Sequence, residues 1–340
     1  MRKRISIWTF AVLASAALVI SCASQKNETA ADHGPVWPPP PDEARVVFVK
    51  TISKPLDIGQ SPSVFRRVAN WITGDDGASL RLQKPFGIAL DENGNLCLTD
   101  TGANCVCYLD FKNKKWLRWD AVGKTHFKSP VAVARKSGIF YVADSELGKV
   151  FAFRGNGKPV FEIGAPLKRP VGLAIANDSL AVVDSQLHCV FVFDLQGKLR
   201  FQFGKRGIGP GEFNFPTHVN TDNAGHLLVT DSLNSRVQIF SADGKYISEI
   251  GSGGDTSGHF GRPKGMAADS FNHIYVADAV FDNVQIFDLS GRLLLNLGET
   301  GNGYGQFGLP NGIAISPDNV IYIADCYNHR VQVLKYIGAQ

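Results

Sequence analysis

The sequence has little charge imbalance once its first segment is set aside. Of its 35 Lys and Arg residues, three lie at positions 2–4, which leaves 32 basic against 31 acidic residues over the rest of the chain. Affinity for nucleic acid depends mainly on a basic surface that neutralises phosphates. The near balance of charge gives no such surface, and we expect no nucleic-acid partner.

Motifs of common catalytic and metal sites are also missing. The sequence contains no GxSxG nucleophile elbow and no HExxH zinc motif. Its glycine-rich stretches open no helix whose N-terminus would hold a phosphate. We therefore expect no catalytic residues, no cofactor and no metal.

Cysteines are few and scattered. After Cys22, five remain, namely Cys97, Cys105, Cys107, Cys189 and Cys326. The spacing of Cys105 and Cys107 fits neither a redox CxxC motif nor a haem-attaching CxxCH motif. We interpret all five as small core residues, and the alternative is a bridge from Cys97 to Cys105 or Cys107.

The first 22 residues have the layout of a lipoprotein signal. A basic start is followed by the uncharged run 5–20, which is too short for a comfortable membrane span. The run leads into Val19-Ile20-Ser21-Cys22, which resembles the lipobox, where a small residue precedes a cysteine that receives diacylglycerol. This resemblance implies cleavage after residue 21 and a lipid anchor on Cys22. An ordinary signal peptide with a chance cysteine is the alternative.

Residues 22–44 are predicted to form a tether. They are polar and proline-rich and end near Trp37 and four prolines, a composition that favours extended structure over a core. Ala23 follows the cysteine, whereas Asp at this position tends to retain lipoproteins in the inner membrane. We expect a lipid-anchored protein of the bacterial cell envelope, in the outer membrane if the host is Gram-negative.

Six similar segments follow one another from residue 85 to the end of the chain. Each begins with a proline and an apolar run, and 14 or 15 residues later a second apolar run ends in Asp. The prolines are Pro85, Pro130, Pro170, Pro216, Pro263 and Pro310, and the aspartates are Asp100, Asp144, Asp184, Asp231, Asp278 and Asp325. Successive prolines lie 40 to 47 residues apart, which is the size of one propeller blade.

Each repeat contains four short alternating runs separated by turn residues such as Asn93-Gly94. The pattern predicts an all-β, six-bladed propeller over residues 85–340. The last repeat supplies only three strands, while an orphan strand is expected at 45–52. We predict that this strand completes the last blade and closes the ring.

The segment 45–84 is also expected to hold a short amphipathic helix at 61–74. Ser61 suits its N-cap, Pro62 its first turn and Gly74 its end. Apolar residues recur on one face of this helix. It either packs against the propeller or docks on a partner or the membrane surface.

Two blade ends carry a recognisable motif. They read Asp231-Ser-Leu-Asn-Ser-Arg236-Val-Gln and Asp325-Cys-Tyr-Asn-His-Arg330-Val-Gln. These segments, with the glycine-rich linkers 204–213 and 298–307, resemble the NHL repeat. The whole layout is similar to bacterial NHL-repeat lipoproteins of unassigned function.

The resemblance implies that Arg236 and Arg330 pair with a repeat aspartate. Other blades depart from it, because their arginine position holds Cys105, Lys149, Cys189 or Asn283. We therefore expect all six repeat aspartates to have a structural role, with their carboxylates bound to backbone amides at the junction of strand and loop.

An enzymatic alternative rests on fold analogy. Peptidylglycine amidating lyase is similar in architecture and holds zinc through histidines directly after the repeat proline. Here those positions are Phe86, Val131, Val171, Thr217, Lys264 and Asn311, none of which is a zinc ligand of that kind. His218, one residue further on, is the residue on which a lyase-like, lactonase-like or small-molecule-binding channel would depend.

The longer loops are expected on the face that carries the glycine-rich linkers. Candidate binding residues around the channel mouth on this face are Phe86, Thr217, His218, Lys264 and Asn311, and those farther out are Arg206, Phe281, Tyr304 and Tyr327. Large aromatic and Arg side chains dominate contact energies at interfaces. We expect a non-enzymatic scaffold that binds a protein or peptide partner in the cell envelope.

Overall fold

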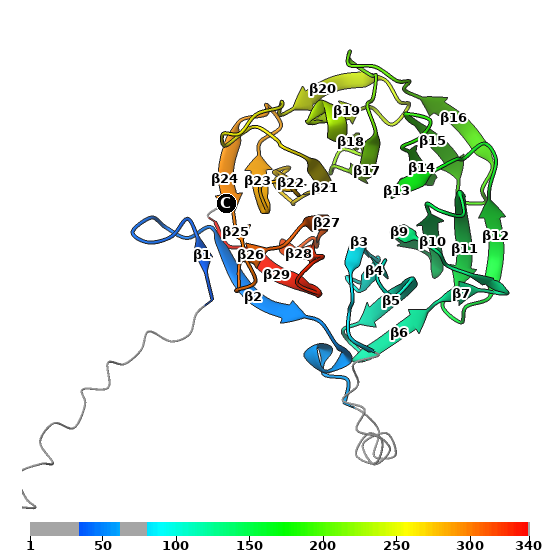
Figure 1. Cartoon of the computed structure of the whole chain (residues 1–340), viewed down its shortest axis with the longest axis horizontal. Coiled ribbons are helices and arrows are strands. Elements are labelled where there is room, and N and C mark those ends of the chain that lie inside the picture. Colours follow the sequence, from blue (N-terminus) through cyan, green and yellow to red (C-terminus); the bar gives the residue numbers. More distant parts are fainter. Residues whose placement is uncertain (1–33, 62–79, 339–340) are drawn as a thin grey trace, which may run out of the picture. The chain divides into compact units, whose positions relative to one another are not determined.

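The chain forms a ring of six antiparallel sheets around a central axis (Figure 1). The computed structural model describes residues 34–61 and 80–338. Each sheet runs from an innermost strand beside the axis to an outer strand at the rim. The prediction of an all-β, six-bladed propeller is confirmed. Over the described ranges, no helix is long and apolar enough to cross a membrane.

The first three blades have four strands each. Blade 1 contains β3 (Pro85–Leu90), β4 (Leu96–Asp100), β5 (Cys105–Asp110) and β6 (Lys115–Trp119). Blade 2 contains β9 (Pro130–Lys136), β10 (Ile139–Asp144), β11 (Lys149–Arg154) and β12 (Pro159–Ile163). Blade 3 contains β13 (Pro170–Ala176), β14 (Ser179–Asp184), β15 (Cys189–Asp194) and β16 (Leu199–Phe203).

The next two blades repeat this order, and the last blade modifies it. Blade 4 contains β17 (Pro216–Thr221), β18 (Leu227–Asp231), β19 (Arg236–Phe240) and β20 (Tyr246–Ile250). Blade 5 contains β21 (Pro263–Ala268), β22 (Ile274–Asp278), β23 (Asn283–Phe287) and β24 (Leu293–Leu297). Blade 6 contains β27 (Pro310–Ile315), β28 (Val320–Asp325) and β29 (Arg330–Tyr336).

The remaining elements are short. β7 (Ala121–Val122) pairs with β8 (Thr125–His126), and β25 (Glu299–Thr300) pairs with β26 (Gln306–Phe307). Two 3-10 turns lie at Pro55–Ile58 and Ser232–Asn234. Most of the predicted amphipathic helix at 61–74, and Cys22 with the signal segment, lie outside the described residues.

The fourth strand of blade 6 comes from the other end of the chain. β2 (Val46–Ile52) pairs antiparallel with β29, so that Ile52 lies opposite Val331 and Val46 opposite Tyr336. β1 (Val36–Trp37), from the end of the predicted tether, adds a fifth strand beside β2. Ile52 and Val46 are fully buried, so the N-terminal strand is part of the core of the ring.

Strands at the second and third positions are buried on both faces because each sheet is covered by the neighbouring blades. All five residues of β18 and all five of β19 are buried, although several are polar. The five cysteines after Cys22 are also buried, and no disulfide joins them, although the Sγ atoms of Cys105 and Cys107 lie 3.9 Å apart. They are core residues, and the alternative bridge from Cys97 is not formed.

The strand directions define two faces. The linker face carries the linkers between blades and the loops that follow each repeat aspartate, such as 204–215 and 232–235. The hairpin face carries the turns between first and second strands, such as 91–95 and 222–226. The repeat proline starts each innermost strand at the linker face and lies opposite the repeat aspartate in the ladder.

Each repeat aspartate is buried and binds main-chain amides of the linker before its own blade. In blade 3, Asp184 accepts hydrogen bonds from the amides of Lys168 at 2.7 Å and Arg169 at 2.9 Å. Its other oxygen accepts from Gln186 and Leu187 in the following loop. One carboxylate thus joins the incoming linker, the second strand and the loop.

In blades 4 and 6, an arginine side chain also binds the repeat aspartate and the preceding linker. Arg236 Nε donates to Asp231 at 3.0 Å, and Arg330 Nε donates to Asp325 at 2.8 Å. The Arg236 guanidinium also donates to the carbonyl oxygens of Gly209 and Glu212 in the preceding linker. The NHL-type side chains therefore hold the long glycine-rich linkers against the blade.

Replacing Asp184 by Ala removes a charged acceptor from four main-chain amides. We expect the free energy of unfolding, measured by urea denaturation, to fall by about 3 kcal/mol. Asp178→Ala, at an exposed position on the hairpin face, is the control and should change it by less than about 0.5 kcal/mol. A loss below about 1 kcal/mol in D184A would contradict this account of the linker.

Closure of the ring by β2 is tested within one strand. Ile52→Ala leaves a cavity in the core and should lower the free energy of unfolding by about 3 kcal/mol. Val49→Ala, whose side chain is 49% exposed on the same strand, should cost less than about 1 kcal/mol. Equal losses in the two variants, measured by thermal or urea unfolding, would show that the strand does not contribute to the core.

Candidate functional site

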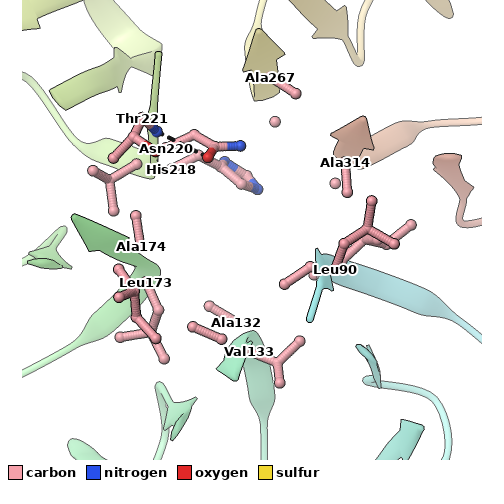
Figure 2. Close-up of a pocket in the computed structure, with 18 of the residues that line it drawn as sticks. Leu90, Ala132, Val133, Leu173, Ala174, His218, Asn220, Thr221, Ala267 and Ala314 are labelled. Atoms are coloured by element: carbon pink, nitrogen blue, oxygen red, sulfur yellow. Dashed lines mark hydrogen bonds between the residues drawn. The ribbon is translucent and has the colours of Figure 1, made fainter. Parts of the chain in front are cut away.

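A cavity of about 480 Å³ lies on the axis of the ring (Figure 2). Its wall is formed by the innermost strands β3, β9, β13, β17, β21 and β27. Each of these strands pairs on one side only, with the second strand of its own blade. The other edge faces the axis, so main-chain N–H and C=O groups line the cavity together with side chains.

Neighbouring innermost strands lie very close together two residues after the repeat proline. A Cβ atom on Gly87 would lie 2.4 Å from the carbonyl oxygen of Val131, and one on Gly312 would lie 2.5 Å from that of Phe86. Glycine at this level lets neighbouring innermost strands approach each other. Blade 2 has Ala132 at this position and blade 4 has His218, whose imidazole projects toward the middle of the ring (Figure 2).

The imidazole of His218 is fixed by residues from two other blades. Its Nε2 lies 2.9 Å from Oδ1 of Asn311 in blade 6, and its ring stacks on Phe86 of blade 1 at a centroid distance of 6.4 Å. Burial, followed by the nearby charge of Lys264, lowers the pKa of His218 to about 3. His218 is therefore neutral at physiological pH and is a weak general base.

Three of the five predicted channel-mouth residues meet, but they close the channel at this level. Phe86, His218 and Asn311 form a layer across the axis, and Asn311 is buried. The cavity lies on the hairpin side of this layer, and its lining includes His218 but not Phe86, Thr217, Lys264 or Asn311. The channel mouth predicted for these five residues is at the linker face.

The other two mouth residues lie beside this layer. Oγ1 of Thr217 is buried without a hydrogen-bond partner, as is Nδ1 of His218. Burial, followed by the neighbouring charge of Arg262, lowers the pKa of Lys264 to about 8. This end of the channel is packed and partly desolvated.

The candidates farther out lie on the linker face. Arg206 is exposed in the linker before blade 4, and Phe281 is half-buried in the loop after Asp278. Tyr304 is stacked on Phe48 of β2 at 4.7 Å and is 59% exposed. Tyr327 is 58% exposed, with the ammonium of Lys84 5.2 Å from its ring centre.

Most of the exposed apolar side chains on this face were not among the residues predicted from the sequence. They belong to linkers or to loops that follow a repeat aspartate, and they are Leu187, Ile208, Phe215, Leu233 and Val280. Ile208 is 80% exposed. Their position in the repeat is the signal that could have identified four of these exposed residues. Two or three residues after a repeat aspartate stand Leu187, Leu233, Val280 and Tyr327.

Ionisable residues on the hairpin side of the cavity were also missed. The Asp91 carboxylate pairs with the Arg135 guanidinium and accepts a hydrogen bond from the Tyr108 hydroxyl at 2.8 Å. Arg135 lies over the rings of Tyr108 and Phe140 at 4.8 and 5.1 Å. These residues come from two blades, and their proximity is a consequence of the ring.

Within residues 34–61 and 80–338, no group of three or more His, Cys, Asp and Glu side chains is arranged so that it could hold a metal ion. His188 Nδ1 accepts a hydrogen bond from the Phe215 amide at 3.1 Å, and His329 Nδ1 contacts the carbonyl oxygen of Gln83. Both histidines therefore contact linkers of the ring.

Sequence comparisons agree with this architecture. The profile of the NHL repeat matches residues 307–334, and that of a 6-bladed beta-propeller family matches residues 164–226 and 219–280. No curated protein sequence matches the chain. The chain therefore contains an NHL repeat and has a six-bladed β-propeller fold.

Solved structures with the same fold include proteins of different kinds. A protein of unknown function from Bacteroides thetaiotaomicron is 17% identical with a TM-score of 0.60, over 86% of this chain and 75% of that one. An auxiliary nutrient binding protein from the same species is 12% identical with a TM-score of 0.60, over 75% and 69%. A catalytically inactive virginiamycin B lyase from Staphylococcus aureus, with quinupristin, is 14% identical with a TM-score of 0.55, over 75% and 95%.

The environment of His218 predicts a dependence of stability on pH. The unfolded state binds a proton on this imidazole near pH 6.5 and the folded state only near pH 3, so stability falls as the pH drops below 6.5. Between pH 7.5 and 5, His218 should account for a loss of roughly 2 kcal/mol in the free energy of unfolding.

Urea unfolding at the two pH values measures this loss. His218→Gln should remove it from the difference between the two pH values, and His126→Gln, at an exposed imidazole, is the matched control. The same difference in H218Q as in the unchanged protein would mean that His218 titrates alike in both states.

Proposed function

We propose that the protein is a non-enzymatic binding scaffold of the bacterial cell envelope, and that its linker face binds an apolar, acidic segment of a partner protein. The observation that carries this proposal is the set of exposed apolar side chains on the linker face. Six of them are at least 40% exposed, namely Ile208, Phe215, Leu233, Val280, Tyr304 and Tyr327. Large apolar side chains gathered on one face of a folded domain are typical of interaction sites.

Basic residues on the same face favour an acidic partner. They lie one or two positions before a repeat proline, and they are Lys84, Lys128, Lys168, Arg169 and Arg262. Since each proline starts an innermost strand, these residues surround the linker end of the channel. Among the acidic residues of this face, Glu212 and Asp282 accept hydrogen bonds from linker amides, and Glu146 lies 3.5 Å from Lys128. Complementary charge of this kind steers association and sets specificity.

The loops that present these side chains are held in place. The main-chain amides of Leu233 and Tyr327 donate to the carbonyl oxygens of Asn214 and Gly308 in the neighbouring linkers. The repeat aspartates also accept hydrogen bonds from main-chain amides of the same linkers. A surface that is ordered before binding loses less conformational entropy in the complex.

Anchoring to the membrane is part of this proposal. A diacylglycerol-modified Cys22 would hold the chain at a membrane surface, in the outer membrane of a Gram-negative host. Residues 23–33 would then connect the anchor to the propeller, whose described part begins at Gly34. The partner would be a protein or peptide of the same compartment.

A double variant tests the linker face. Leu233→Ser with Tyr327→Ser removes two exposed apolar contacts, and we expect recovery of crosslinked partners from the native envelope to fall at least about tenfold. Ile247→Ser, at a 47% exposed position of the outer strand β20, is the control. Quantitative mass spectrometry of the captured proteins measures the recovery.

Charge is tested separately. Lys168→Glu with Arg169→Glu should weaken capture by a similar factor at low salt and by less at high salt, because screening reduces the contribution of these charges. Unchanged recovery in both double variants would refute binding through this face.

A further inference from the structure

The cavity on the axis reaches the hairpin face, opposite the surface proposed for the partner. Glu92, Asn177 and Asn223 stand where lining strands end at this face, and all three are exposed. At the other end, the layer of Phe86, His218 and Asn311 closes the channel. The cavity is therefore a blind pocket whose mouth is on the hairpin face.

Apolar side chains, polar side chains and strand edges share the wall of this pocket, and Asn220 and Thr221 are among the polar residues (both are labelled in Figure 2). Partly exposed aliphatic residues that line it include Leu90, Ile175, Ala268 and Ile315 (Leu90 is labelled in Figure 2). Between them, the free edges of the innermost strands offer main-chain donors and acceptors.

Charged groups of the pocket are already engaged with each other or with neighbours. Asp91 pairs with Arg135, and Lys136 lies 3.2 Å from Asp178. Glu92 accepts a hydrogen bond from the Ser137 amide, and Asp222 lies 2.7 Å from Nδ1 of His226. His218 at the closed end is neutral. A charged ligand would therefore lose its hydration without gaining a free counterion.

We propose that this pocket is a binding site for a neutral small molecule with an apolar body and a hydroxyl or amide group, which enters from the hairpin face. The aliphatic side chains contact the apolar body, and the strand edges take the place of water at its polar group. The volume lies in the range of roughly 300–1,000 Å³ that is typical of small-molecule sites. This site is independent of the linker face and of the protein partner proposed there.

Three matched probes test the ligand class. 4-Propylphenol is neutral at pH 7, 4-propylbenzoate is an anion and 4-propylbenzylamine is a cation. Binding is measured by ligand-observed NMR titration of the purified full chain, with empty detergent micelles as the blank. We expect 4-propylphenol to bind with a Kd below about 1 mM, and at least about tenfold more tightly than either charged probe, because burying an unpaired charge is costly.

Two filled-cavity variants test the place of binding. Ala89→Phe and Ala268→Phe put a large ring into the pocket from blades 1 and 5, and each should weaken 4-propylphenol binding at least tenfold. Ala242→Phe, on an exposed turn between β19 and β20, is the matched control. Circular dichroism and thermal unfolding establish that each variant is folded before it is titrated.

The outcomes separate this proposal from the proposed function. Loss of probe binding in the filled-cavity variants, together with unchanged binding in the Leu233→Ser, Tyr327→Ser double variant, supports a pocket that does not depend on the linker face. Failure of all three probes to bind, equal affinity for the charged probes, or binding that survives both filled-cavity variants would overturn it. Those results leave partner capture by the linker face unaffected.

Discussion

The carboxylate of the repeat aspartate is the interaction on which the rest of the structure depends. It ends the second strand of each blade and binds amides of the linker that comes from the previous blade, as Asp184 does with Lys168 and Arg169. Because the linker leads directly into the repeat proline, the same contact sets the start of the innermost strand. The wall of the channel and the loops of the linker face are therefore both positioned by a short chain of hydrogen bonds around one buried carboxylate.

The side chain that the third strand offers to the preceding linker is polar in blades 4 to 6 and apolar in blades 1 to 3. In blades 4 to 6, Gln238, Gln285 and Gln332 each accept from one glycine amide of the preceding linker and donate to a carbonyl oxygen of that linker. The equivalent positions of blades 1 to 3 are Cys107, Phe151 and Phe191, which are buried in hydrophobic clusters. The long glycine-rich linkers, with exposed Ile208 and Tyr304, occur where the polar network exists to hold them. The exposed linkers and the NHL-type side chains are thus two parts of one arrangement.

Local pattern was sufficient to predict much of the fold and little of the pocket. Three features predicted the six-bladed ring: the repeated pairs of a proline and an aspartate such as Pro170 and Asp184, the number of strands in each repeat, and the orphan strand at 45–52. Each of these features concerns residues that are neighbours in the chain or in one sheet. Closure of the channel by Phe86, His218 and Asn311 depends on side chains from blades 1, 4 and 6. The order of residues along the chain says nothing of which way those side chains turn, so their meeting across the axis could not be predicted from the sequence. The apolar loop positions after each aspartate were visible, but their exposure depends on the packing of the ring.

The most direct test of binding through the linker face is site-specific photocrosslinking in the native envelope. A photoreactive amino acid at Leu233 reports on the linker face, and one at Phe271, which is 39% exposed on the hairpin face, reports on the opposite side. Binding through the linker face predicts a defined protein adduct from position 233 and none of comparable yield from position 271. An adduct from position 271 alone would place the partner on the hairpin face and would refute binding through the linker face.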